Sequence, residues 1–122
     1  MTPYVYAWLL SFAFTEVVEV PVYRTLLRTS VFRAFVPSAL THPVIWFVIF
    51  PNLHASYVAK GCLSEAFAVG VEACLCFLML RQSRFAIAKR SAVWLRALAI
   101  STLANGLSVG LGLLSRSLFG VP

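Results

Sequence analysis

Apolar residues fill four long stretches of this chain, and short basic segments separate these stretches. They cover about residues 3–23, 34–50, 62–80 and 92–114. Each comes near the roughly 20 residues that a helix needs to cross a hydrocarbon core about 30 Å thick. The second stretch is the shortest and contains Pro37 and Pro43, which we expect to bend it. The pattern predicts an all-α protein in which residues 1–122 form a single domain, a four-helix transmembrane bundle.

The composition agrees with a membrane protein. Hydrophobic residues make up 61% of the chain, charged residues only 11%, and the mean hydropathy is +0.89. A soluble domain of this size could not cover so much apolar surface. The net charge of +6 would suit nucleic acid, but the basic residues lie between the apolar stretches, where they indicate topology. We therefore expect no nucleic-acid partner.

The distribution of basic residues predicts the orientation. Around the segments that follow the first and third stretches there are eight basic residues, Arg24, Arg28, Arg33, Arg81, Arg84, Lys89, Arg90 and Arg96. The opposite side has only Lys60 and Arg116. Because basic loops stay in the cytoplasm, we expect a multi-pass protein of the cell inner membrane with both termini outside. Two interfacial aromatic belts are expected, formed at one face by Tyr4, Tyr6 and Trp8 and at the other by Tyr23 and Trp94.

Two segments of the chain resemble each other. Residues 32–42 align with residues 95–105, which pairs Arg33 with Arg96, Ala34 with Ala97, Ser38 with Ser101, Leu40 with Leu103 and His42 with Asn105. Upstream, Val18-Glu19 resembles Val71-Glu72. The alignment predicts two tandem helical hairpins in a parallel repeat, related by a pseudo-two-fold axis along the membrane normal.

All four acidic residues lie inside the apolar stretches, and the chain has no Asp. They are Glu16, Glu19, Glu65 and Glu72. An ionisable group near the centre of a membrane helix costs roughly 2.5–3.5 kcal/mol on insertion scales, so such groups usually face a polar interior. This placement predicts a buried polar core.

Four polar side chains fall at one depth, one on each helix. Counted from the cytoplasmic arginines at about 1.5 Å per residue, they lie roughly 12–14 Å from the cytoplasmic end. They are Glu16, His42, Glu72 and Asn105, and we expect them to form a ligand or ion site together with Glu19 and Glu65. Thr15, Ser38, Thr41, Ser101 and Ser108 could supply further hydrogen bonds.

Other uses of these carboxylates stay open. They could hold helices or subunits together through hydrogen bonds, although such bonds in membranes average only about 0.6 kcal/mol. A metal site is not expected, because no helix carries a Glu-x-x-His pair, and no cofactor is indicated. Cys62, Cys74 and Cys76 lack the spacing of a zinc site or a disulfide framework.

The fourth stretch carries the features of a packing helix. Ser101, Asn105, Ser108 and Gly112 form one small polar stripe, and Gly106 and Gly110 form a GxxxG pair on an adjacent face. Small residues let helices approach closely in lipid, so we expect close packing or an association surface. Residues 106–110 also match G-x-S-x-G, but that nucleophile motif requires a strand–turn–helix elbow. We therefore predict that the protein is not an enzyme.

Two resemblances add expectations. The opening residues, an early intramembrane Glu and four spans are similar to the small multidrug resistance transporters, which dimerise and exchange protons for cationic drugs. That resemblance would give the proton-exchanging role to Glu16, but the middle of the chain lacks that family's Trp and Gly features.

A broader pattern resembles small, uncharacterised four-span bacterial inner-membrane proteins, which implies a location but no activity. It comprises residues 16–23 (Glu-x-x-Glu-x-Pro-x-Tyr), 41–47 (Thr-His-Pro-x-x-Trp-Phe), 65–73 (two Glu and Ala) and 101–113 (Ser, Ala-Asn, Ser and Gly-Leu).

Taken together, the residues predict a small membrane protein whose buried Glu/His/Asn layer binds a proton, a cation or a small polar ligand, as a transporter or channel-like subunit. The alternative is a non-catalytic subunit or assembly factor of a larger membrane complex. The expected partners are the lipid bilayer and either further copies of the chain or other membrane subunits.

Overall fold

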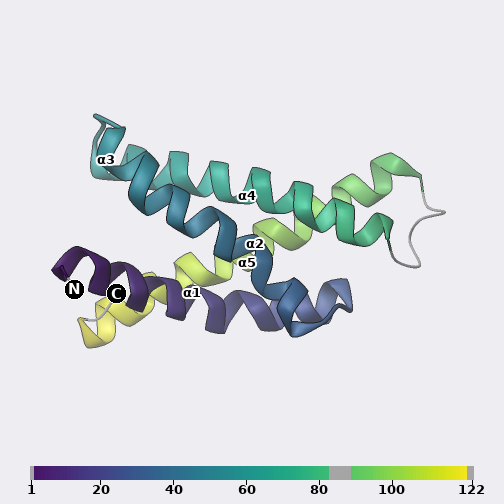
Figure 1. Cartoon of the computed structure of the whole chain (residues 1–122), viewed down its shortest axis with the longest axis horizontal. Helices are drawn as coiled ribbons and strands as arrows, with labels where there is room; N and C mark the ends of the chain where they lie inside the picture. Colours follow the sequence, from purple (N-terminus) through teal and green to yellow (C-terminus); the bar gives the residue numbers. More distant parts are fainter. Residues whose placement is uncertain (1, 83–88, 121–122) are drawn as a thin grey trace.

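The computed structural model describes residues 2–82 and 89–120. The helices are α1 (Pro3–Leu27), α2 (Val31–Val44), η1 (Ile45–Ile49), α3 (Phe50–Asn52), α4 (Tyr57–Arg81) and α5 (Arg90–Phe119). Because α2, η1 and α3 follow one another without a break, they form one span, and the described residues contain no strand (Figure 1).

All four spans are long and apolar enough to cross a membrane. They comprise Pro3–Leu27, Val31–Asn52, Tyr57–Arg81 and Arg90–Leu118. The predicted all-α transmembrane bundle is therefore confirmed. Each helix extends beyond its apolar stretch, most clearly in α4, which begins at Tyr57 rather than at residue 62. The helical hydrogen bonds continue through the polar residues at the ends, which hydropathy alone does not register.

Side-chain caps begin three of the helices. The hydroxyl groups of Thr2, Ser30 and Ser56 accept hydrogen bonds from backbone N–H groups in the first turns of α1, α2 and α4. Such a cap satisfies one of the donors that the first turn of a helix leaves free. Arg28 ends α1 with a left-handed backbone (φ 52°), which makes the connection to α2 short.

The two prolines of the second span do not end the helix. Pro37 and Pro43 lie inside α2, and the π-helical segment η1 begins directly after Val44. Proline removes one backbone donor, and a π-helical turn is a common way for a helix to absorb such a disturbance. At the end of this segment the Phe50 N–H bonds to the Ile45 carbonyl.

The helices pack as two crossed hairpins. The beginning of α1, α3 and the end of α5 lie at one end of the bundle, and the α1–α2 connection, the end of α4 and the beginning of α5 lie at the other (Figure 1). Beyond the hairpin partners, α1 packs against α5 and α2 packs against α4, whereas α1 and α4 barely touch. Exchanging the hairpins maps the first cross-contact onto the second, as expected for the predicted parallel repeat.

Burial repeats in the same register. The offset that aligns Glu19 with Glu72 also aligns Tyr23 with Cys76 and Leu27 with Leu80. In the second helix of each hairpin, Ala34 corresponds to Ala97 and Ser38 to Ser101. All ten side chains are at most 5% exposed. The two halves thus bury equivalent positions, which supports the repeat.

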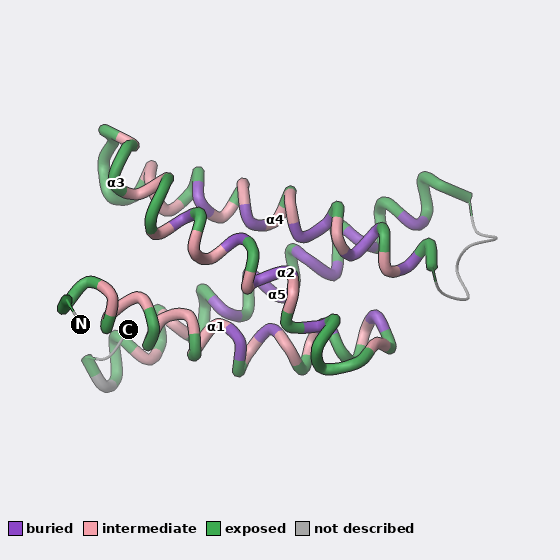
Figure 2. Tube along the Cα trace, viewed as in Figure 1, coloured by how far each residue is buried: buried purple, intermediate pink, exposed green. Residues whose placement is uncertain are grey.

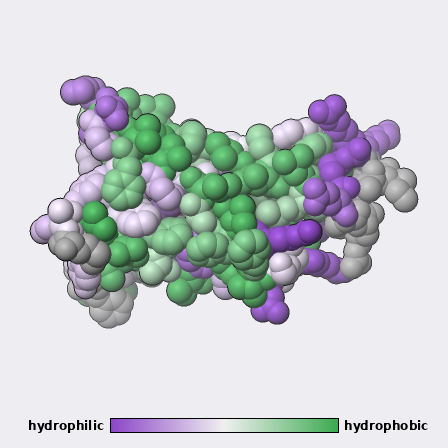
Figure 3. All heavy atoms as spheres, in the orientation of Figure 1, coloured by the Kyte–Doolittle hydropathy of each residue, from purple (hydrophilic) through white to green (hydrophobic). Residues whose placement is uncertain are grey.

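The surface has the polarity of a membrane protein. A wide apolar belt covers the middle of the molecule, and hydrophilic residues lie at its two ends, most densely where α4 ends and α5 begins (Figure 3). Buried positions are unevenly distributed along α1, where all of them lie in its second half (Glu16, Glu19, Tyr23 and Leu27) (Figure 2). On α1, the helix packing is therefore closest toward the end that leads into α2.

Candidate functional site

Glu72 is the centre of the buried polar core. It lies on α4 and is 1% exposed. Its Oε2 accepts hydrogen bonds from the Tyr23 hydroxyl at 2.5 Å and from the Asn105 amide at 2.6 Å. Its Oε1 accepts from the Thr41 hydroxyl at 2.6 Å. Since these donors come from α1, α5 and α2, one carboxylate connects all four spans.

The donors that surround Glu72 are neutral. An ionised carboxylate only accepts hydrogen bonds, so three donors suit it well, but none of the three brings a positive charge. Asn105 is held in place because its amide also donates to the Ser101 carbonyl at 3.1 Å. The amide therefore points at the carboxylate before any ligand arrives.

Thr41 has more than one acceptor within reach. Its Oγ1 lies 2.6 Å from Glu72 Oε1, 3.2 Å from the Pro37 carbonyl and 3.4 Å from the Ser38 carbonyl. Because a hydroxyl group has a single proton, donation to Glu72 competes with donation to the backbone of α2. The contact to Glu72 is the shortest of the three and is the one expected to persist.

Glu19 is the equivalent carboxylate of the first hairpin. It is 1% exposed and accepts a hydrogen bond from the Ser38 hydroxyl. The matching Ser101 donates instead to the Val69 carbonyl, at 3.0 Å. The two halves of the repeat therefore share burial but not hydrogen bonding, and among the described residues Glu72 is the one carboxylate that joins all four helices.

A partly open cavity of about 270 Å³ borders these carboxylates. Glu19, Glu72 and Asn105 lie at its inner end, and Glu65, seven residues before Glu72, lines it closer to the beginning of α4. Its outer end is lined by residues near the ends of the helices, which are Phe50, Tyr57 and Arg116. The cavity thus leads from the polar core toward the end of the bundle that carries both termini.

Aromatic rings follow one wall of this cavity. The ring of His42 lies 5.4 Å from that of Phe12 and 6.0 Å from that of Trp46, measured between centroids. Trp46 in turn lies 5.8 Å from Phe50. His42, Trp46 and Phe50 all line the cavity, which therefore combines carboxylates with aromatic faces.

Several buried polar atoms have no hydrogen-bond partner. They are both carboxylate oxygens of Glu16, Nδ1 of His42, Oγ of Ser64 and Nε1 of Trp8. Ser64 is only 2% exposed and lines the cavity beside Glu65. Because buried polar groups normally have partners, Ser64 and His42 leave hydrogen-bonding capacity at the cavity wall.

The predicted polar layer is only partly assembled. Glu72 and Asn105 meet directly, and His42 lines the same cavity. Glu16, in contrast, does not line the cavity, and neither of its carboxylate oxygens has a hydrogen-bond partner among the described residues. Counting residues gives depth but not rotation, and on α1 it is Glu19 that faces the cavity.

The sequence interpretation missed the role of Tyr23. Its assignment to an interfacial belt is wrong, because the side chain is 0% exposed and its hydroxyl donates to Glu72. A signal was present, since Tyr23 follows Glu19 by four residues and so shares its helix face.

The packing stripe of α5 is buried at Ser101, Asn105 and Ser108 and half-buried at Gly112, whereas the GxxxG pair is exposed. Ser101 and Ser108 are 0% and 8% exposed, and a methyl group added at Gly112 would lie 3.8 Å from the Phe14 ring. Gly106 and Gly110 are exposed, and a methyl group added there would meet nothing within 4 Å. They pack against no other described part of the chain, so their role as an association surface stays a prediction.

Two other kinds of site can be compared with the structure. Among the described residues, no group of three His, Cys or Glu side chains could hold a metal ion. The G-x-S-x-G segment lies within the uninterrupted helix α5, so Ser108 is not on the elbow that the hydrolase motif requires.

Comparisons with protein-family models, curated proteins and solved structures found no significant match to this chain. The carboxylate-lined cavity is therefore the feature from which a function can be inferred.

Proposed function

We propose that this multi-pass protein binds a proton or a small cationic ligand in the cavity, as a transporter or channel-like subunit. The observation that carries the proposal is that Glu19, Glu65 and Glu72 line one partly open cavity. We place the protein in the cell inner membrane with its basic segments in the cytoplasm. The cavity then opens toward the outside, where both termini lie.

A purely structural role accounts for only some of the carboxylates. Hydrogen bonds within the chain occupy Glu19 and Glu72. Glu65 is partly exposed, lines the cavity and accepts no hydrogen bond from the described residues. Because a carboxylate is costly at membrane depth, an acid that stabilises no helix contact favours a ligand-binding role.

The side chains that line the cavity indicate the type of cation. The described residues provide no three-ligand group for a metal ion. The cavity does provide aromatic faces at Trp46 and Phe50, and aromatic faces attract organic cations. This supports a proton or an organic ammonium ion over a metal ion.

Binding of tetramethylammonium to the purified full chain in mild detergent tests the proposal. We expect saturable binding that Glu65→Gln weakens at least tenfold. Glu16→Gln is the matched control, because it neutralises another intramembrane acid that lies outside the cavity, and it should leave the affinity within about twofold. Absence of saturable binding, or equal losses in the two variants, would contradict the binding of an organic cation in this cavity.

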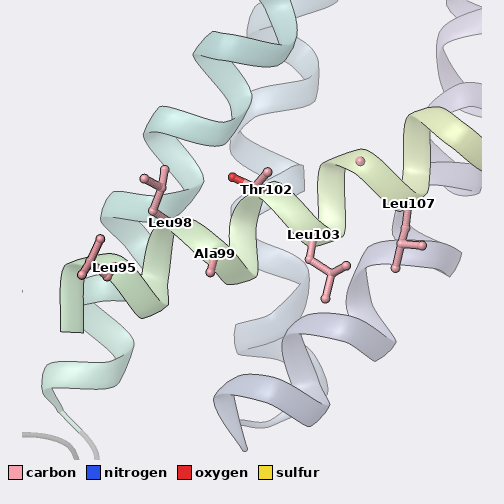
Figure 4. Close-up of a pocket in the computed structure, with 7 residues that line it drawn as sticks. Leu95, Leu98, Ala99, Thr102, Leu103 and Leu107 are labelled. Atoms are coloured by element: carbon pink, nitrogen blue, oxygen red, sulfur yellow. The ribbon is translucent and has the colours of Figure 1, made fainter. Parts of the chain in front are cut away.

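A second candidate function has a separate observation in its favour. An apolar groove runs along the outward face of α5, and Figure 4 shows the side chains that line it: Leu95, Leu98, Ala99, Thr102, Leu103, Gly106 and Leu107. Small residues on an outward face favour helix association in membranes, which supports a subunit or assembly factor. Gly106→Leu should then release a co-purifying partner, whereas an unchanged particle mass would count against this role.

A further inference from the structure

We propose that the ligand of the cavity is a small zwitterion whose ammonium group binds near Glu65 and whose anionic group binds Arg116. This inference rests on the proposed cation site and adds the chemical class of the ligand. It depends on the charge distribution along the cavity, on the spacing of two residues and on an unpartnered hydroxyl group.

The cavity has opposite charges at its two ends. Glu19 and Glu72 lie at its inner end and Glu65 lies between them and Arg116, which is the single Lys or Arg among the residues that line the cavity. A guanidinium group repels a simple cation that enters past it, whereas it binds a carboxylate or phosphate well. A ligand with both charges is complemented at both ends.

Lys60 provides a comparison for Arg116, which lines the cavity. It is the other basic residue on this side of the protein, but it does not line the cavity. Its Nζ donates instead to the Phe50 carbonyl at 3.0 Å. Lys60 therefore provides a matched control of the same charge at nearly the same depth.

The spacing of the charged groups limits the size of the ligand. Glu72 on α4 contacts Asn105 on α5, so these two residues mark a common level. Glu65 lies seven residues from Glu72 toward the outside, and Arg116 lies eleven residues from Asn105 in the same direction. The difference of four residues places the two levels roughly 6 Å apart, a distance that a short amino acid spans.

Ser64 supplies an independent indication of a ligand. Its side chain is 2% exposed, lines the cavity and has no hydrogen-bond partner. Because Ser64 and Glu65 both line the cavity, this hydroxyl is available to a ligand that contacts the carboxylate. The nearby rings of Trp46 and Tyr57 can cover the ligand's ammonium and methylene groups.

Three probes of equal chain length separate the contributions of the two charges. They are 4-aminobutanoate, butylamine and butanoate, titrated by calorimetry into the full chain in mild detergent. We expect 4-aminobutanoate to bind at least tenfold more tightly than either singly charged probe. Equal or tighter binding of butylamine would overturn the zwitterion and leave the cation site intact.

Arg116→Gln should affect the affinities of the two amines differently, whereas Glu65→Gln should lower both. Arg116→Gln should weaken 4-aminobutanoate at least tenfold but leave butylamine unchanged or tighter. Glu65→Gln should weaken both amines, and Lys60→Gln should change neither by more than about twofold. If Arg116→Gln leaves 4-aminobutanoate unchanged, the zwitterion is overturned. If no amine binds and tetramethylammonium also fails, the proposed function falls with it.

Ser64→Ala distinguishes a ligand contact from a structural role. The hydroxyl has no partner in the chain, so its removal should leave the melting temperature unchanged and weaken 4-aminobutanoate about threefold or more. A lower melting temperature with unchanged affinity would contradict the inference that Ser64 contacts the ligand.

A free zwitterion and the headgroup of phosphatidylethanolamine share this chemistry. Lipid discs of phosphatidylglycerol, with and without phosphatidylethanolamine, distinguish the two sources. If the headgroup is the natural ligand, phosphatidylethanolamine should compete with 4-aminobutanoate and lower its apparent affinity at least tenfold. An unchanged affinity assigns the site to a free zwitterion.

Discussion

The two ends of this bundle are built differently. Toward the hairpin connections, small and apolar side chains close the core: Tyr23, Leu27, Ala34, Cys76, Phe77, Leu80, Val93, Ala97, Ile100 and Ala104. Toward the termini, the same helices enclose a partly open cavity with carboxylates and unpartnered polar atoms. Close packing at one end can hold the helices in place while the other end stays open, which is a suitable arrangement for a binding site inside a membrane.

Glu72 lies where these two regions meet, and its removal should have the largest effect on stability. Glu72→Ala leaves the buried hydroxyl of Tyr23 and the amide of Asn105 without their acceptor. Since each unsatisfied buried group costs about 1–3 kcal/mol, we expect the free energy of unfolding to fall by roughly 3 kcal/mol. Denaturation of the purified chain in detergent measures this loss.

The control for Glu72→Ala is the same change at Glu65. Glu65 accepts no hydrogen bond from the described residues, so Glu65→Ala should leave the free energy of unfolding within about 0.5 kcal/mol. Equal losses at the two positions would show that the packed and open regions do not differ in the way that the hydrogen bonds indicate.

A larger side chain in the packed region should have the next largest effect on the free energy of unfolding. Ala97 is 0% exposed, and the close contact of α4 and α5 leaves no space for a bigger group. Ala97→Leu should therefore lower the free energy of unfolding by about 1–3 kcal/mol, measured by the same denaturation.

Gly106→Ala is the control for Ala97→Leu, because an added methyl group there meets nothing within 4 Å. It should be neutral or stabilising by up to about 1 kcal/mol, since Ala favours a helix more than Gly does. A loss at Gly106 comparable to that at Ala97 would argue against a packed region confined to the inward face of α5.

Tyr23→Phe isolates one bond of the Glu72 cluster. The ring stays in the core, and only the hydroxyl that donates to Glu72 at 2.5 Å is lost. We expect a loss of about 1 kcal/mol with little change in ligand affinity, because Tyr23 does not line the cavity. A large change in affinity with unaltered stability would place Tyr23 in the binding site instead.

The fold could be predicted from sequence further than the site could. Hydropathy alone was enough to locate four spans, and the alignment of Arg33 with Arg96 located the repeat that burial supports. Depth along a helix can be counted from sequence, which brought Glu72 and Asn105 together correctly. Rotation about the helix axis depends on how the four helices pack, so sequence alone does not show that Glu19 rather than Glu16 lines the cavity, or that Tyr23 is buried.

The smallest predicted effect is that of Ser101→Ala. Ser101 and Ser38 occupy corresponding positions in the two halves of the repeat. Ser101 donates only to a backbone carbonyl, that of Val69, and hydrogen bonds between membrane helices average about 0.6 kcal/mol. Ser101→Ala should therefore cost roughly that amount.

Ser38 differs from Ser101 because its acceptor is the carboxylate of Glu19. Hydrogen bonds to charged groups contribute about 1.5–3 kcal/mol when they form, so Ser38→Ala should cost more than Ser101→Ala if Glu19 is ionised. Ser38→Ala should also change the affinity for tetramethylammonium measurably, because Glu19 lines the cavity. Equal losses at the two serines, with unchanged affinity, would mean that the halves are equivalent in energy as well as in burial. The difference in hydrogen bonding between the two hairpins would then lie in Glu72 alone.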